Sequence, residues 1–201
     1  MKIDIFNTEK QYDIIYADPP WSYNDKGCHG AAESHYKTMS IEQIKALPVK
    51  KIAKSNSVLF LWATYPKLQE ALELIESWGF KYKSIAFQWV KLNRNTDINT
   101  FTKEAFISNS IDEAMKKNCF FGLGRWTRGN TEPCLIATKG KVSRKDASVG
   151  QLVFAPLTKH SAKPYEVRDK IVSLIGGGEK IELFARTNAD GWDCWGDEAP
   201  E

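Results

Sequence analysis

The sequence predicts an α/β domain with a mostly parallel β-sheet of about seven strands, flanked by helices. Short apolar runs such as residues 13–17 and 58–63 barely alternate with polar residues, as expected of strands covered on both faces. Stretches with the helical spacing of apolar residues lie between several of these runs. The 201 residues suffice for one full core, so we expect a single domain over residues 1–201.

Seven runs have the length and composition of buried strands. They are Ile3–Phe6, Tyr12–Ala17, Ser57–Ala63, Ser84–Lys91, Pro133–Thr138, Gln151–Ala155 and Lys180–Ala185. Because helices are expected between some of these runs, the strands are predicted to pair mostly in parallel.

Helices are expected over residues 41–47, 66–78 and 164–175. Ser40 suits the N-cap of the first helix, and a proline suits the first position of each of the other two. The glycine triplet at residues 176–178 precedes a strand instead of following one. We therefore interpret it as a turn that ends a helix.

The stretch from residue 93 to about residue 130 interrupts this rhythm. It is polar and rich in Asn, Thr and Lys, with a weak helical signal near residues 111–116, so we expect an irregular insertion that gates the site. Residues 91–145 contain 11 Lys/Arg against 5 Asp/Glu, although the net charge of the whole chain is only +3. This basic segment fits a phosphate-facing surface and equally a solvated face.

Other features exclude several classes of protein. The four cysteines lie far apart, and the histidines do not complete a zinc site, so we expect reduced thiols and no metal. Residues 1–13 mix polar, acidic and apolar residues, unlike a signal peptide. No apolar run approaches the length that spans a membrane. We expect a cytoplasmic protein without a membrane partner.

The most informative segment is the loop Asp18-Pro19-Pro20-Trp21, which follows the buried run of residues 12–17. Catalytic groups of parallel α/β sheets lie at the carboxyl ends of strands. Two prolines stiffen the turn and leave backbone carbonyls without competing local donors.

Such a loop has the groups that methylation of an exocyclic amine requires. A carboxylate and a fixed carbonyl can accept hydrogen bonds from both protons of the adenine N6 amine and favour a pyramidal nitrogen. The flat face of Trp21 can hold a base that has left its stack. The alternative is a rigid turn with Trp21 packed in the core. We interpret Asp18, Pro19, Pro20 and Trp21 as the catalytic residues.

Taken with its other motifs, the sequence resembles the MT-A70 family of adenine-N6 methyltransferases over nearly its whole length. The motifs that carry the resemblance are Tyr16–Trp21, Tyr36–Ser40, Leu59–Trp62, Trp89–Lys91, Glu132–Leu135, His160–Pro164 and Lys180–Phe184. The first motif is specific, and the order and spacing of the others strengthen it.

The resemblance implies a Rossmann-like methyltransferase fold of permuted order, with the catalytic motif before the cofactor motif. It also implies S-adenosyl-L-methionine as cofactor, bound by Asp4, Ile5, Asp18, Ser161, Lys163, Glu182, Arg186, Asn188, Asp197 and Glu198. Lys163 precedes a helix start, where the helix dipole disfavours a cation, so an anion is expected beside it. The resemblance suggests the methionine carboxylate. Asn188 stands where eukaryotic members commonly have His.

The same resemblance assigns six residues to the substrate: Tyr36, Arg125, Trp126, Arg128, Asn130 and Glu132. Tyr36 belongs to a segment that resembles a gate over the bound base, with a plain surface loop as the alternative. The arginines would grip phosphate, and Glu132 would orient the target or the neighbouring loops. For Trp126, base stacking and a folding role are equal alternatives.

The expected function is therefore methylation of the adenine N6 amine in a nucleic acid. DNA is favoured over RNA because the chain is compact and lacks additional nucleic-acid modules, as in bacterial and phage members of the family. The alternatives are RNA adenine methylation, a non-catalytic nucleic-acid-binding subunit, and methylation of protein glutamine, as by Asn-Pro-Pro-Tyr loops. A homo- or heterodimer is compatible with the sequence.

Overall fold

The computed structural model describes residues 1–23, 38–122, 124, 126–158 and 162–200. Tyr36, Arg125 and Ser161, which the sequence assigned to the site, lie outside these residues.

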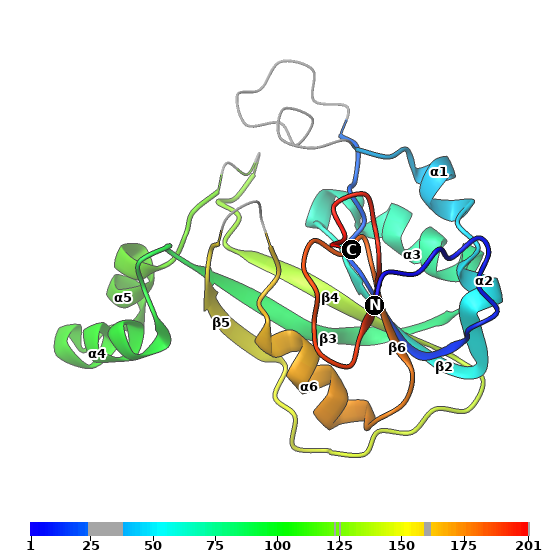
Figure 1. Cartoon of the computed structure of the whole chain (residues 1–201). Helices are drawn as coiled ribbons and strands as arrows, with labels where there is room; N and C mark the ends of the chain where they lie inside the picture. Colours follow the sequence, from blue (N-terminus) through cyan, green and yellow to red (C-terminus); the bar gives the residue numbers. More distant parts are fainter. Residues whose placement is uncertain (24–37, 123, 125, 159–161, 201) are drawn as a thin grey trace.

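A seven-stranded sheet forms the centre of the molecule, in the order β5-β3-β4-β2-β1-β6-β7 (Figure 1). The strands are β1 (Tyr12–Ala17), β2 (Ala53–Trp62), β3 (Lys81–Leu92), β4 (Thr131–Lys139), β5 (Leu152–Pro156), β6 (Lys180–Leu183) and β7 (Asp193–Trp195). β4 is antiparallel to β2 and β3, whereas the other neighbouring pairs are parallel. The predicted α/β class and mostly parallel sheet are confirmed.

Helices cover both faces of this sheet, so each face has its own core. The helices are α1 (Ile41–Lys45), α2 (Val49–Ile52), α3 (Leu68–Ser77) with the preceding 3₁₀ turn η2 (Tyr65–Lys67), and α6 (Glu166–Ile175). α1, α2 and α3 pack on the face that carries Ile15 and Leu59, and α6 packs on the face that carries Ile14 and Phe60 (Figure 1). Adjacent residues of β1 and β2 are thus both buried, which explains why these runs barely alternate.

The predicted helices are present, and Ser40 and Gly176 lie at the ends predicted for them. The two prolines do not hold the first helical positions, because Pro66 lies in η2 and Pro164 precedes the N-cap of α6. The Ser40 side chain accepts a hydrogen bond from the backbone of Gln43, whose side chain reaches back to the Ser40 backbone. Gly176 ends α6 with a φ of 92°, a conformation that favours glycine. Among the described residues, no helix has the length and apolar character needed to cross a membrane.

The prediction of irregular structure in the insertion is wrong. This region contains α4 (Ile98–Ser108) and α5 (Ile111–Asn118), which form a helical hairpin that projects from the sheet (Figure 1). The side chains of Asp97 and Ser110 cap the two helices. The helical signal was weak because much of the apolar surface faces solvent. Phe106, for example, is 87% exposed.

Two differences from the predicted strands lie near the chain ends. The expected strand Ile3–Phe6 is wrong, because an isolated bridge joins Lys2 to Cys194 and residues 5–7 form a turn. The three-residue strand β7 was not predicted, because so short a segment gives no periodic pattern.

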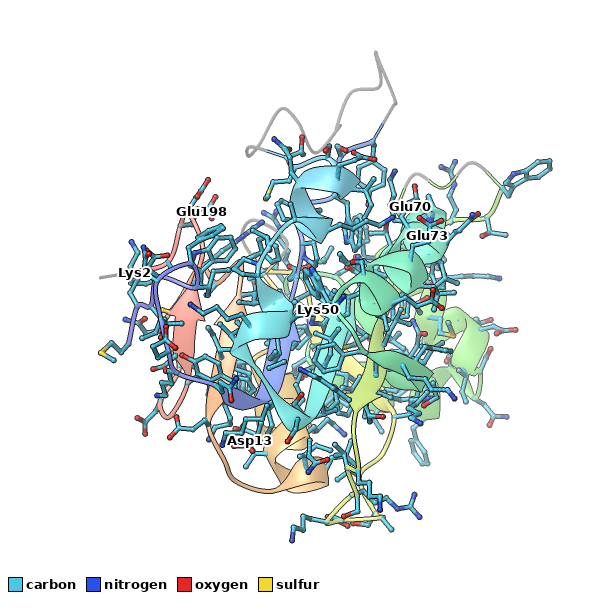
Figure 2. The ribbon with its side chains drawn as sticks, turned by 90° about the vertical axis from the view of Figure 1, so that its right-hand side faces the viewer. Lys2, Asp13, Lys50, Glu70, Glu73 and Glu198 are labelled. Atoms are coloured by element: carbon cyan, nitrogen blue, oxygen red, sulfur yellow. The ribbon has the colours of Figure 1, made fainter. Side chains whose placement is uncertain are left out.

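The carboxyl ends of β1, β6 and β7 meet at one edge of the sheet, because these neighbouring strands are parallel. Gly196 lets the last loop lie close to the loop after β6: a Cβ at this position would lie 3.0 Å from backbone atoms of Phe184 and Ala185. Figure 2 shows the two ends of this part of the sheet, with Asp13 near the start of β1 and Glu198 beyond the end of β7. The insertion follows β3 and leaves the sheet from the same edge as Glu198.

Candidate active site

Asp18 begins the loop at the carboxyl end of β1, and backbone hydrogen bonds fix that loop. The Trp21 N–H donates to the Pro19 carbonyl at 2.9 Å, and the Met39 N–H donates to the Pro20 carbonyl at 2.9 Å. The expectation that the prolines leave their carbonyls without donors is therefore wrong. Each carbonyl oxygen still has a second lone pair that can accept a hydrogen bond.

The Trp21 indole faces the interior of the protein. It is 6% exposed, packs in the core beneath α1, α2 and α3, and donates its Nε1–H to the Trp62 carbonyl at 3.3 Å. The expected open platform for an extruded base is therefore wrong for this arrangement. The observed arrangement is the alternative in which Trp21 packs in the core and anchors the loop to the end of β2.

The Asp18 carboxylate is the first member of a row of alternating charges. Nζ of Lys163 lies 2.8 Å from each Asp18 carboxylate oxygen and 3.2 Å from Oε1 of Glu132. Nζ of Lys91 lies 2.7 Å from Oε2 of Glu132. The four side chains are between 8% and 23% exposed, so solvent screens these charges weakly.

Burial and neighbouring charges shift the proton affinities in this row. Burial raises the pKa of Asp18 above its ordinary value, although Lys163 opposes the shift. Burial acts on Glu132 in the same direction, but Lys163 and Lys91 outweigh it and lower the pKa of Glu132. Asp18 and Glu132 raise the pKa of Lys163 against the effect of its burial. Asp18 is thus a stronger base than an exposed aspartate.

Lys163 contacts two carboxylates of the chain itself, and its assignment to the methionine carboxylate stays a prediction. The expected anion is present, but it consists of Asp18 and Glu132 of the chain itself. Within the described part of the chain, three carboxylate oxygens face the three ammonium donors of Lys163. Lys163 therefore belongs with the catalytic loop.

A cavity of about 320 Å³ opens beside Asp18, between α1 and the loops that follow β1, β6 and β7. Its aromatic side chains are Phe6, Phe184 and Trp195. The ring centroids of Phe184 and Trp195 are 5.4 Å apart, and those of Phe6 and Trp195 are 6.3 Å apart. The cavity joins the Asp18 carboxylate to the last strand of the sheet.

The polar groups of the cavity are mostly acidic. Asp18, Asp197 and Glu198 contribute carboxylates, whereas Arg186 contributes a guanidinium whose Nε lies 3.4 Å from Glu198. S-adenosylmethionine combines a planar adenine, a ribose diol, a sulfonium, an ammonium group and a carboxylate, and Arg186 is a cation of the cavity lining that suits the carboxylate. Aromatic rings suit the adenine, and carboxylates suit the hydrogen-bond donors and positive charges of the diol, sulfonium and ammonium groups. The residues of this cavity therefore fit that cofactor.

Four residues that the sequence assigned to the cofactor line this cavity, namely Asp18, Arg186, Asp197 and Glu198. Asp4 and Ile5 are not among its lining residues, and their assignment to the cofactor stays a prediction. Ile5 is fully buried in the core, and the exposed Asp4 accepts a hydrogen bond from the backbone of Phe6. Their neighbour Phe6 is the residue that reaches the cavity.

Glu182 and Asn188 also lie outside the cavity lining, and their assignment near the ribose stays a prediction. Glu182 accepts hydrogen bonds from Nε of Arg168 at 2.7 Å and from its Nη2 at 2.9 Å. The Asn188 side chain accepts a hydrogen bond from the Cys194 thiol at 3.3 Å and lines a separate open hollow that includes Met1 and Lys10. These interactions are structural contacts of β6 and β7 rather than parts of the cavity.

The residues expected to contact the substrate separate into a buried and an exposed group. Glu132 is 6% exposed and belongs to the charge row beside Asp18. Trp126 is 95% exposed, and Arg128 is also exposed, in the segment between Gly122 and Gly129 that an isolated bridge closes. The Asn130 carbonyl accepts a hydrogen bond from the Lys91 N–H at 2.8 Å.

Phe6, Phe184, Trp195 and Lys91 are site residues that the sequence-based assignment missed. Phe6 and Trp195 come together with Phe184 because the chain ends lie side by side with the loop after β6, and no local pattern indicates that. Phe184 itself ends the family-like motif Lys180–Phe184. Lys91 had a usable signal, since it ends one of the motifs that resemble the MT-A70 family.

The mostly parallel α/β sheet, with an acidic turn and an adjoining aromatic cavity at its carboxyl edge, is consistent with a methyltransferase fold. The MT-A70 family profile matches residues 12–119 and 112–198, and the chain belongs to this family of adenine-N6 methyltransferases.

Curated relatives come from several kingdoms. The chain is 34% identical to the type II methyltransferase M.MunI of a Mycoplasma species, over 96% of this chain and 79% of the relative. It is 28% identical to the human N(6)-adenine-specific methyltransferase METTL4, over 96% of this chain and 39% of the relative. It is 26% identical to an N(6)-adenosine-methyltransferase MT-A70-like protein of Arabidopsis thaliana, over 98% of this chain and 24% of the relative. The chain thus spans less than half the length of these two eukaryotic relatives.

Proposed function

We propose that this chain methylates the N6 amine of adenine in DNA, with S-adenosylmethionine as the methyl donor and Asp18 as the catalytic residue. The observation that carries the proposal is the position of Asp18. Its carboxylate contacts Lys163 and also lines the aromatic and acidic cavity. Membership of the MT-A70 family supports the same reaction.

Asp18 would activate the amine by accepting a hydrogen bond from it. The N6 lone pair is delocalised into the purine ring, and an acceptor that draws on the N–H favours the pyramidal, nucleophilic nitrogen. An ionised carboxylate has about four acceptor sites, so Asp18 can accept from the amine while Lys163 donates to it. The raised pKa also makes Asp18 a better acceptor for the proton that the amine must lose. The second lone pair of a Pro19 or Pro20 carbonyl would accept from the other amine proton.

The cavity residues would hold the cofactor. Phe6, Phe184 and Trp195 would contact the adenine, and Asp197 and Glu198 would accept hydrogen bonds from the ribose and ammonium groups. When bound, S-adenosylmethionine supplies an electrophilic methyl group. The chain's own contribution is to bring the amine and the cavity together, because positioning lowers the barrier to transfer.

Trp126 and Arg128 support a nucleic-acid substrate. An exposed indole can stack on an unpaired base, and an exposed guanidinium can bind a phosphate. Tyr36, Arg125 and Asn130 would complete this surface, as the family resemblance implies. We assign DNA because the similarity to the type II methyltransferase M.MunI extends over most of both chains.

We further infer that residues 1–201 act as one catalytic domain with the cofactor motif after the catalytic motif. The order of the cavity loops supports this arrangement, since Asp18 follows the first strand and Asp197 follows the last. A dimer remains a prediction of the sequence.

The proposal is tested by incubating the protein with S-adenosylmethionine labelled in its methyl group and with matched single- and double-stranded DNA and RNA. Digestion to nucleosides then identifies the methylated base. We expect label in N6-methyladenine from DNA. Label mainly in RNA would correct the substrate, and label in neither polymer, with cofactor binding intact, would support the non-catalytic alternative.

A glutamine-containing peptide serves as the control substrate. Label in this peptide but in no adenine would replace the proposed reaction with methylation of protein glutamine.

A further inference from the structure

Lys91 is the outermost cation of the charge row and has no part in the proposed function so far. Its Nζ contacts Glu132 at 2.7 Å, and Glu132 in turn contacts Lys163, which contacts Asp18. The Lys91 side chain is 20% exposed, and its Nζ lies 5.0 Å from the centroid of the Trp89 ring. Lys91 is thus linked to the catalytic carboxylate through two intervening groups.

The strands explain why Lys91 and Glu132 meet. Trp89 of β3 lies opposite Glu132 of β4 in the antiparallel register, and Lys91 follows two residues later on the same face as Trp89. A diagonal neighbour in a β-ladder is within reach of a long side chain. The contact is therefore set by two strands of the sheet and not by a surface loop.

The number of charges indicates what Lys91 contributes. Asp18 and Glu132 both contact the single ammonium group of Lys163. Lys91 gives Glu132 a second cation, so the row contains two carboxylates and two ammonium groups. If Lys91 were neutral, Glu132 would depend on Lys163 alone and would draw that ammonium group away from Asp18. Because the row is largely buried, water compensates little for such a loss.

We propose that Lys91 is a positioning residue for catalysis, because it anchors the Glu132 carboxylate and so leaves Lys163 to fix the carboxylate of Asp18. The inference rests on the proposed function of Asp18 and extends it to a residue that need not touch either substrate. Lys91 acts through Glu132, which makes the effect of changing Lys91 depend on the charge at residue 132.

The other charged and titratable groups around Asp18 do not replace this relationship. Arg186 lowers the pKa of Asp18, and it comes from the loop after β6. Glu182 and the Cys134 thiol lie near enough for their proton affinities to respond to the Asp18 charge. Glu132 raises the pKa of Asp18 by like-charge repulsion, and Lys163 lowers it. Lys163 is therefore the cation whose placement matters most for Asp18 among the described residues.

The test compares Lys91→Met, Lys91→Arg, Glu132→Gln and the double variant Lys91→Met/Glu132→Gln in the full chain. Methyl transfer to adenine in duplex DNA is followed at saturating cofactor. We expect Lys91→Met to lower kcat about tenfold, with the KM for DNA changed less than about twofold. Lys91→Arg keeps the charge and should stay within about threefold of the original kcat.

The double variant is the decisive member of the set. A Gln at residue 132 needs no counter-ion, so Lys91→Met should cause little further loss of kcat once Glu132→Gln is present. Loss of Lys163 from Asp18 also weakens the ionised form of Asp18. The acid limb of the kcat profile should therefore move to higher pH in Lys91→Met and move back in the double variant.

Several outcomes would overturn the inference. One is a loss of kcat from Lys91→Met that is as large in the Glu132→Gln background as in the original chain, because a lysine that acts through Glu132 has no effect once residue 132 is neutral. Another is a fall of about one in the salt slope of DNA binding in Lys91→Met, because that result describes a phosphate contact. An unchanged pH profile in Lys91→Met would also contradict the inference. If the original chain methylates no adenine, the proposed function fails first, and a changed Asp18 pKa in Lys91→Met, measured by NMR, still tests the row itself.

Discussion

Two regions at the same edge of the sheet have opposite properties. The cavity after β1, β6 and β7 is concave, aromatic and acidic, with Asp18, Asp197 and Glu198 on its wall. The insertion after β3 projects outward, belongs to the basic part of the sequence, and carries the 95% exposed Trp126. The first region is suited to a small cationic nucleoside, and the second is suited to a polyanion that bears bases.

The fold places the proposed sites for the cofactor and for the nucleic acid in separate parts of the structure. The cavity is made by loops that adjacent parallel strands bring together, so its shape depends on the core of the sheet. The insertion packs on the sheet through a small cluster that includes Leu92, Cys119 and Phe101. Changes in the insertion should therefore affect polynucleotide binding without disturbing the cavity. Asp18 and its row of charges lie between the two regions.

We expect the largest effect on methyl transfer at Asp18, which lines the cavity and lies between the two regions. Asp18→Asn should lower the rate of methyl transfer by about 100- to 1,000-fold, because the amide lacks the charge that favours a pyramidal amine. Single-turnover kinetics with labelled cofactor measure the loss. Asp13→Asn is the matched control, since Asp13 lies at the opposite end of β1 (Figure 2). A rate near that of the original chain in Asp18→Asn would remove this carboxylate from the mechanism.

The pH dependence should carry the signature of the same group. The ionised form of Asp18 is the active form, and burial raises the pKa of Asp18. Activity should therefore be lost on acidification at a higher pH than an exposed aspartate would allow, and it should recover as the pH rises. The kcat profile between acidic and neutral pH checks this direction. An acid limb below the ordinary range of aspartate would contradict it.

Trp21→Phe tests whether the indole of Trp21 anchors the loop in the core or serves as a platform for an extruded base. The change removes the donor to the buried Trp62 carbonyl and part of the indole volume, so the free energy of unfolding should fall by about 1 to 3 kcal/mol. Chemical denaturation measures this change. Trp126→Phe should leave stability unaltered, because that indole is exposed. Full stability in Trp21→Phe, together with weaker DNA binding, would restore Trp21 as the base platform.

Phe6→Ala tests the cavity alone. Phe6 is 54% exposed, so its removal should leave the fold intact, yet it is part of the aromatic wall. The Kd for S-adenosylmethionine should rise about tenfold, a value typical for the loss of one aromatic contact to a base. Calorimetry gives the Kd, and Phe106→Ala on the projecting hairpin is the control. Equal cofactor affinity in Phe6→Ala and the original chain would move the cofactor elsewhere.

The smallest effects are expected in the exposed part of the insertion. Arg128→Ala should reduce the salt slope of DNA binding by about one and weaken binding a few-fold, while the Kd for the cofactor stays constant. Trp126→Ala should weaken binding to single-stranded more than to duplex DNA. Fluorescence titrations at several salt concentrations separate these contributions. A change in cofactor affinity in either variant would mean that the two regions are not independent.

The fold was predictable from the sequence where burial on two faces leaves a continuous apolar run. β1 was predicted with its observed ends, and β2, β3, β4 and β5 were predicted within a few residues. β7 and the turn at residues 5–7 were missed because they are short and depend on pairing with distant residues. α4 was missed because its exposed apolar residues give a poor amphipathic pattern.

The sequence predicted where the site lies better than it predicted which side chains contact one another there. Asp18, Asp197 and Glu198, which the sequence assigned to the cofactor, line one cavity because they follow strands whose ends share one edge. The contacts of Trp21 and Lys163 were not predicted because each side chain has a partner far away in sequence, Trp62 for one and Glu132 for the other. A local motif indicates which residues are candidates for a functional role, but it does not indicate the direction in which their side chains point.

In the proposed reaction, the N6 amine of adenine receives the methyl group. The most direct measurement compares transfer of labelled methyl to two DNA duplexes that differ only in whether adenine or 2-aminopurine occupies the target position. Because 2-aminopurine has its amine at C2, no nitrogen of that base would meet Asp18 as the N6 amine does. We predict label in the adenine duplex and none above background in the 2-aminopurine duplex. Equal labelling of both duplexes would contradict the account.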